Sequence, residues 1–461
     1  MKSGGTKQNS DTLRRVWVFL IPVSLFVIGC GVNPSAEDRT DIGDRWTDPG
    51  SGSAGENDDP TDTGGETIDT SDPGDQEDED DVALTVSPFE VTRTLSPADD
   101  VTEVVSGDIK SSSAVEVFDI GAIASGDRLV IAAEAVNSLD PVVAVFDAGG
   151  DAMIVNDDRN YYGGDFNSAI DMVSRRSTKR CYVAVASSGG TGTTGGYSLA
   201  ILLARGGAVP EINTQVVYLN FDGADGIVIG RRPAVEIPVF EGSLIGEEFA
   251  GETEELIEQI VARIREDYTG LDVDFVSSRE ENQPTEPHTT IHFGAYDPGL
   301  LGLADYVDEF NVAVSQKAIV FVDTFQAFLP LNPSVEEMAN ALANVGSHET
   351  GHLLGLNHSE DVRGIMDITA NLRQMLASQA FRRAPFNPEV FPIGHQDAGK
   401  LLVEAVGGDL SLFKSAAAEQ LSMRAAWYDE GEPISARLRV DQPFSTCLCP
   451  SCAKHRHLRD R

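Results

Sequence analysis

Cysteines, basic residues and long apolar runs are all scarce in this chain of 461 residues. None of the five cysteines lies between Cys30 and Cys181, so the spacing indicates no disulfide framework. Lys and Arg number 34 against 74 Asp and Glu, and the formal charge of −40 excludes nucleic acid as a partner, because a polyanion would be repelled. The apolar run at residues 16–28 is too short to span a bilayer comfortably.

The amino terminus does contain the parts of an export signal. Basic residues come before the apolar run, which ends at Gly29-Cys30; they are Lys2, Lys7, Arg14 and Arg15. A basic region followed by an apolar segment of this length predicts a signal peptide over residues 1–30.

The end of that segment, Val27-Ile28-Gly29-Cys30, resembles a bacterial lipobox. This resemblance implies that Cys30 is diacylated and becomes the mature amino terminus. Acyl chains would hold the exported protein at a membrane, at the cell surface or in the periplasm, without a spanning helix. The alternative is a plain signal peptide that is cut elsewhere with loss of Cys30, which would leave a secreted protein.

Residues 31–81 contain almost no apolar side chains and carry 18 Asp and Glu against 2 Arg. Such a segment cannot bury enough surface to offset its conformational entropy. We therefore expect an acidic, disordered linker that repulsion between carboxylates extends.

Short β-rich runs separated by Gly, Asp, Asn and Ser fill residues 82–205. No helical period is present, so the pattern predicts an antiparallel β-sandwich. The runs are 115–120, 128–135, 142–146, 153–156, 169–173, 182–186 and 197–203. The order of Asp127-Arg-Leu-Val-Ile, Asp140-Pro-Val-Val-Ala-Val-Phe, Asn156-Asp-Asp and Gly195-Gly-Tyr-Ser-Leu resembles the bacterial pre-peptidase C-terminal (PPC) domain. That resemblance implies a jelly-roll-like module of the kind often attached to secreted peptidases.

Oxygen-bearing side chains cluster around two turns of this region: Asp147, Asp151, Asn156, Asp157 and Asp158. Hard oxygen ligands of this kind can hold Ca²⁺. Asp and Asn are equally favoured in turns for their hydrogen bonds to the backbone, so both interpretations stay open. Cys181 begins an apolar strand and is expected to be a buried free thiol.

The strongest chemical signal is His348-Glu349-x-x-His352-x-x-Gly355-x-x-His358. Residues four apart lie on one face of a helix, so His348 and His352 can present two imidazole nitrogens to one metal ion. Gly355 lets the helix stop and the chain swing back, which brings His358 to the same ion. Three imidazoles with an open fourth position are typical of a catalytic zinc. Glu349 can then act as general base toward a metal-activated water.

This motif resembles that of the metzincin metallopeptidases. Ser359-Glu-Asp-Val-Arg-Gly-Ile-Met366 is similar to the matrixin continuation, which implies that Met366 forms the Met-turn beneath the histidines. Ile368 stands where astacin-like and serralysin-like members carry a tyrosine ligand, so no further protein ligand is expected. No cysteine-switch segment is visible, because no cysteine lies between Cys30 and Cys181.

The α/β pattern around the motif predicts a metzincin-like catalytic domain over residues 210–408. We expect strands at 215–221, 272–276, 289–293, 303–307 and 318–323, and helices at 252–268, from Ser334 through the motif, at 370–382 and at 396–406. The resemblance implies that the run 303–307 is either the edge strand that pairs with an extended substrate or an ordinary interior strand.

Residues 409–461 hold Cys447, Cys449 and Cys452 near two histidines, and the choice between a small zinc site and a disordered basic tail stays open. Together these features predict an exported, lipid-anchored, zinc-dependent endopeptidase that acts on proteins or peptides. The alternative is a catalytically inert surface binding protein whose sandwich mediates adhesion or binds calcium. The sequence predicts no oligomeric state.

Overall fold

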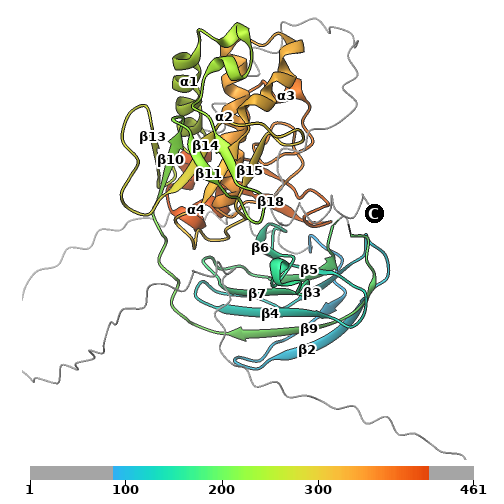
Figure 1. The fold of residues 1–461 in the computed structure, drawn as a ribbon. Helices are drawn as coiled ribbons and strands as arrows, with labels where there is room; N and C mark the ends of the chain where they lie inside the picture. The colour runs from blue at the N-terminus through green and yellow to red at the C-terminus, as the bar shows by residue number, and fades with distance from the viewer. Residues whose placement is uncertain (1–86, 190, 415–461) are drawn as a thin grey trace, which may run out of the picture. The chain divides into compact units, whose positions relative to one another are not determined.

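The computed structural model describes residues 87–189 and 191–414, all of them within one compact unit (Figure 1). The predictions for the signal peptide, Cys30, the acidic linker and the cysteines at 447, 449 and 452 lie outside the described residues. Within the described part of the chain, no helix is long and apolar enough to cross a membrane.

Residues 93–204 form two sheets, as the sandwich prediction requires. The first has the order β2-β9-β4-β7 and is antiparallel throughout. Its strands are β2 (Glu103–Ile109), β4 (Arg128–Ala135), β7 (Ser168–Val173) and β9 (Gly195–Ala204). Alternate residues of β9 are buried, namely Tyr197, Leu199, Ile201 and Leu203, which is the pattern of a strand with one face on a core.

The second sheet has the order β1-β3-β8-β5-β6 and is antiparallel except for the pair β1 and β3. Its strands are β1 (Arg93–Thr94), β3 (Val115–Asp119), β5 (Pro141–Phe146), β6 (Ala152–Asn156) and β8 (Tyr182–Ser187). Every residue of β5 and β8 is buried, so both faces of this sheet are covered. Cys181 is a buried free thiol, as expected, and burial raises the pKa of this group.

The region from residue 215 onward has a mixed sheet with the order β13-β10-β14-β16-β15 and two long helices. The three neighbours β13, β10 and β14 are parallel, β16 continues in parallel, and β15 is antiparallel at the edge. The bounds are β10 (Gln215–Asn220), α1 (Thr253–Asp267), β13 (Val273–Ser277), β14 (Thr289–Phe293), β15 (Gly302–Ala304), β16 (Lys317–Val320) and α2 (Val335–Leu353). A β-sandwich followed by an α/β layer confirms the predicted fold class.

Helices α1 and α2 pack against each other because Gly346 allows close approach. A Cβ on Gly346 would lie 2.9 Å from Cδ1 of Ile264 and 3.2 Å from Cζ of Phe293. Shorter elements complete the region: β11 (Ala224–Ile227), β12 (Val235–Ile237), η4 (Gly242–Leu244), η5 (Glu247–Phe249), η6 (Val322–Leu331), α3 (Leu372–Met375), β17 (Arg383–Pro385), β18 (His395–Asp397) and α4 (Ala398–Val406). One further turn, η3 (Tyr161–Gly163), lies in the sandwich region.

The helix expected at 370–382 is wrong in length, since α3 is a single turn. The predicted start at residue 370 lies close to the observed one, where Asn371 and Gln374 form a capping box. The helix does not continue to residue 382, because the side chain of Asn344 hydrogen-bonds to backbone groups that a longer helix would pair internally. Its Nδ2 donates to the carbonyls of Met375 and Ala377, and its Oδ1 accepts from the Gln379 amide. Tertiary hydrogen bonds therefore end this helix.

Candidate metal centre and active site

The active-site helix α2 begins and ends with well-formed caps. Ser334 accepts a hydrogen bond from the Glu337 amide at 3.2 Å, and Glu337 accepts one from the Ser334 amide at 2.8 Å. At the other end the Gly355 amide donates to the His352 carbonyl and the Leu356 amide donates to the Gly351 carbonyl, which is a Schellman motif. The helix is buried from Met338 to Leu353, so its side chains have little freedom to move.

Gly355 is needed at the end of this helix for two reasons. Its φ is +95°, in the region that favours glycine. A Cβ there would also lie 3.0 Å from the carbonyl oxygen of Asp308 and 3.0 Å from Cα of Glu309. The reversal leads the chain directly to His358.

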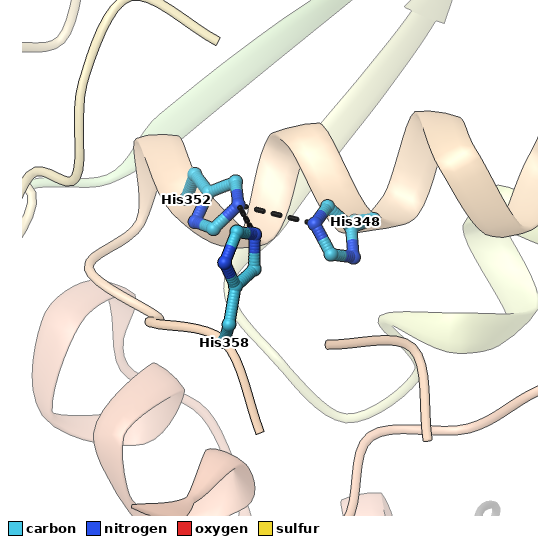
Figure 2. A group of neighbouring side chains, drawn as sticks. All are labelled: His348, His352 and His358. Carbon is cyan, nitrogen blue, oxygen red and sulfur yellow. Dashed lines mark hydrogen bonds between the residues drawn. The ribbon is translucent and has the colours of Figure 1, made fainter. Parts of the chain in front are cut away.

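The three motif histidines come together at one point (Figure 2). Nε2 of His352 lies 3.1 Å from Nε2 of His348 and 3.1 Å from Nε2 of His358. Tetrahedral zinc with Zn–N bonds of about 2.05 Å places its nitrogen ligands about 3.3 Å apart, close to this spacing. All three rings are buried.

The hydrogen bonds of the Nδ1 atoms determine which nitrogen of each histidine can bind a metal. Nδ1 of His348 lies 2.6 Å from the Ile365 carbonyl, and Nδ1 of His352 lies 2.7 Å from the Leu356 carbonyl. A carbonyl only accepts, so each Nδ1 carries the proton and each Nε2 presents a lone pair. Two lone pairs at 3.1 Å cannot hydrogen-bond to each other, and a cation between them satisfies both. The residues therefore fit a zinc ion.

Glu349 is fully buried beside the edge strand β15. A Cβ on Gly302, the first residue of β15, would lie 2.3 Å from Oε1 of Glu349 and 2.7 Å from Cγ1 of Val345. The backbone of the edge strand therefore runs directly against the carboxylate. Sequence reasoning missed the importance of Gly302, although a glycine at the start of a predicted strand signals close approach.

Replacing Gly302 by Ala is expected to lower kcat/KM for peptide cleavage about a hundredfold, because a base displaced by roughly 1 Å loses that much rate. The added Cβ meets Val345 as well as Glu349, so the start of β15 has to move away from α2, which displaces the carboxylate relative to the strand. The zinc content is expected to persist, because no histidine of the motif is among the atoms nearest to this Cβ. Peptide hydrolysis and metal content measure the two effects. Gly251→Ala is the matched control, since a Cβ there meets nothing within 4 Å. Equal activity of Gly302→Ala and the control would contradict the expectation.

Met366, the predicted Met-turn residue, packs against α2, the helix that carries two of the histidines. It is buried, and a Cβ on Gly351 would lie 2.7 Å from its Sδ. The Ser359 amide donates to the Met366 carbonyl at 2.9 Å, which closes the turn. The same turn supplies the Ile365 carbonyl that orients His348. Gly351, which gives Met366 its room, was not singled out from the sequence.

The loop that follows β15 contacts the end of α2. The Asp308 amide donates to the His352 carbonyl at 3.0 Å. Burial raises the pKa of the Asp308 carboxyl to about 6, although the Ala313 amide and Nε2 of Gln316 donate to it. Phe310 and Asn311 follow with φ of +65° and +50°.

The remaining described histidines lie outside the metal group. Nδ1 of His288 lies 2.8 Å from the Glu286 carbonyl, and Nδ1 of His292 lies 3.1 Å from Nδ2 of Asn220. The His395 amide pairs with the Gly150 carbonyl at 3.1 Å.

His292 gives an expected pH dependence of stability. Burial, and then the charge of Lys317, lower the pKa of His292 to about 4 from 6.5. The unfolded chain therefore binds more protons between these values, so stability should fall by up to about 3 kcal/mol as the pH drops from 6.5 to 4. Denaturant titrations of the metal-free protein against pH measure this, and His292→Gln should flatten the dependence. The same dependence of the unfolding free energy on pH in the wild type and in His292→Gln would refute this expectation.

The five calcium candidates divide into two groups. Asp151 pairs with Arg383 and Lys400, and Asp147 pairs with Arg176 through Oδ2 while its Oδ1 accepts from the amides of Gly149 and Asp151. Asp157 and Asp158 lie instead with Asp140, and these three carboxylates approach within 4.8 Å of one another. Oδ1 of Asn156 accepts the Ala169 amide. Calcium binding stays a prediction.

The α/β layer, the three convergent histidines on and after one helix, and the buried methionine turn agree with the sequence resemblance to metzincin metallopeptidases. The family model described as Matrixin, peptidase M10, matches residues 262–380. This segment includes the end of α1, the whole of α2 and the whole histidine motif.

Solved structures similar to parts of the chain fall on both regions. The pre-peptidase C-terminal domain of collagenase from Bacillus anthracis is 12% identical, with 25% of this chain and 98% of that chain covered and a TM-score of 0.19. Archaemetzincin from Methanopyrus kandleri is 17% identical, with 38% and 92% covered and a TM-score of 0.22. PliG from Aeromonas hydrophila, a periplasmic lysozyme inhibitor, is 15% identical, with 24% and 96% covered and a TM-score of 0.19. A search of curated proteins found no match.

Proposed function

We propose that this protein is a zinc-dependent endopeptidase. The observation that carries the proposal is the convergence of three buried imidazole nitrogens on one point. Glu349, the residue after His348 in the chain, is also buried. The matrixin match over the same residues supports it. His348, His352 and His358 would hold the ion, and Glu349 would be the general base.

A zinc ion held by His348, His352 and His358 would supply a Lewis acid that lowers the pKa of a water and polarises the scissile carbonyl. Glu349 accepts the proton of the attacking water and later delivers it to the departing amine. The substrate backbone is expected to pair with β15, the last strand in the order of the sheet, because an extended peptide can add to an edge strand through main-chain hydrogen bonds. Gly302 then places that backbone next to the Glu349 carboxylate.

Metal analysis of the purified protein, combined with a casein or gelatin cleavage assay, tests the proposal. We expect one zinc per chain, cleavage that a chelator abolishes, and recovery when zinc is returned. Protein that binds zinc but cleaves no substrate would favour the inert surface binding protein instead.

We also propose that the protein is exported and anchored through a diacylated Cys30, which the lipobox-like sequence supports. Mass spectrometry of the mature amino terminus tests this. A peptide that begins with acylated Cys30 is expected, and an unmodified terminus elsewhere would replace the anchor by a plain signal peptide.

A further inference from the structure

The segment that follows the Met-turn lies on the β-sandwich. Phe386 and Phe391 are buried in the same apolar cluster as Phe146 and Tyr182 of the second sandwich sheet. The ring centroid of Phe146 lies 6.4 Å from that of Phe386 and 5.6 Å from that of Phe391. These rings cover the outer face of β5 and β8, which explains why both strands are buried on both faces.

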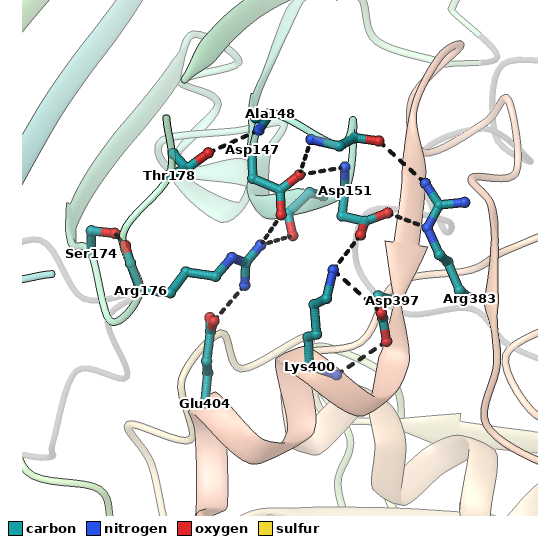
Figure 3. Close-up of polar contacts among 12 residues, drawn as sticks. Asp147, Ala148, Asp151, Ser174, Arg176, Thr178, Arg383, Asp397, Lys400 and Glu404 are labelled. Atoms are coloured by element: carbon teal, nitrogen blue, oxygen red, sulfur yellow. Dashed lines mark hydrogen bonds and ion pairs between the residues drawn. The ribbon is translucent and has the colours of Figure 1, made fainter. Parts of the chain in front are cut away.

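Ion pairs also join the sandwich to residues 383–404 (Figure 3). The Asp151 side chain is only 4% exposed and pairs with Arg383 at 2.5 Å and with Lys400 at 2.6 Å. Arg176 joins Asp147, at 3.4 Å, to Glu404. Buried pairs of this kind contribute little net stability, but removing one partner leaves an uncompensated charge, so they enforce one relative placement.

The same segment holds the backbone on both sides of His358. Gln396 is 1% exposed; its Oε1 accepts the Asn357 amide at 2.7 Å, and its Nε2 donates to the Asn357 carbonyl at 2.7 Å. On the other side the Asn387 amide donates to the His358 carbonyl at 3.1 Å, and the Glu360 amide donates to the Pro385 carbonyl at 2.9 Å. A bidentate side chain and two backbone bonds therefore fix the position of His358.

His358 needs this support because it lies outside the helix. His348 and His352 belong to α2 and are held by its hydrogen bonds, whereas α2 ends at Leu353. The third ligand depends on a loop, and a loop is held by what it packs against.

We propose that the β-sandwich is a positioning element of the metal centre: it holds residues 385–396, and these hold His358 in the geometry that zinc requires. Gln396 is the residue that transmits this support most directly. The inference rests on the proposed metal site and goes beyond it, because it assigns to the sandwich a part in metal binding and not only in attachment or adhesion.

Zinc affinity of the full chain tests the proposal independently of activity. We would measure the dissociation constant of Zn²⁺ by competition with a chromophoric chelator, and the visible absorption of the Co²⁺-substituted protein as a report on ligand geometry. The variants are Phe391→Leu, at the contact, and Asp151→Asn, which keeps its volume and removes the ion pairs. Phe118→Leu is the matched control, because Phe118 is equally buried but lies in the core between the two sandwich sheets.

Phe391→Leu and Asp151→Asn are expected to weaken zinc binding 10- to 100-fold, roughly the effect of losing a residue that orients a ligand, and to alter the Co²⁺ spectrum. Phe118→Leu should lower the melting temperature and leave the affinity unchanged. Wild-type affinity in both contact variants would overturn the inference while leaving the proposed function intact. A wild-type protein that binds no zinc would overturn both. Should Phe391→Leu not fold, Asp151→Asn decides the question.

Discussion

Replacing Glu349 by Gln is expected to lower kcat/KM for peptide hydrolysis by about a thousandfold, with one zinc still bound per chain. Loss of general-base catalysis lowers rates by roughly 10² to 10⁴. Gln has the shape of Glu but cannot accept the proton of the attacking water. Because Glu349 is fully buried against Gly302, the isosteric side chain has no room to adopt another position, so the change should be confined to chemistry.

Cleavage of a fluorogenic peptide and zinc content, measured on the same preparation, separate loss of the base from loss of the metal. Glu336→Gln is the matched control: it lies on the same helix, and its side chain is 64% exposed in an ion pair with Arg263. Full activity in Glu349→Gln would refute the assignment of the base. Loss of zinc together with activity would show that the carboxylate supports the site rather than the reaction.

Replacing His352 by Ala is expected to weaken zinc binding by roughly a thousandfold and to abolish cleavage. Structural zinc sites with four ligands bind with roughly 10 to 16 kcal/mol, which is about 3 to 4 kcal/mol for each ligand. His352 is the ligand whose Nε2 lies 3.1 Å from both of the others, so its loss leaves two nitrogens that no longer surround the ion.

Chelator competition measures this affinity, and elemental analysis gives the zinc content of the purified variant. His288→Ala is the control, because His288 bonds to Glu286 and Gln283 and takes no part in the histidine group. Wild-type zinc affinity in His352→Ala would exclude the three-histidine site.

The convergence of the three histidines could be predicted because most of it is local. Residues four apart on a helix meet on one face whatever surrounds them, and a glycine after the helix permits the reversal that delivers His358. The sandwich was predictable for a similar reason, since alternation within each strand reports burial on one side. The sequence left open whether the run 303–307 is an edge strand or an interior strand. In the structure β15 pairs only with β16 and is therefore an edge strand of its sheet.

The remaining features depend on residues far apart in the chain. Asp147 and Asp151 occupy turns that suit calcium, yet Asp151 pairs with cations 232 and 249 residues later, a distance over which turn chemistry gives no information. The helix expected at 370–382 is shortened by Asn344, whose role requires knowledge of how α2 and α3 pack. Gln396 contacts Asn357 only because both segments have already been placed by the fold.

The double coverage of β5 and β8 also affects how this protein can be divided. A fragment that ended after β9 would leave Val142, Ala144 and Phe146 without Phe386 and Phe391, which bury them together with Phe89. Such a fragment would expose an apolar surface and is expected to self-associate. Transfer of this sandwich to another protein would therefore have to include a loop equivalent to the one that carries Phe386 and Phe391. The sandwich is for this reason not expected to fold well as an independent module.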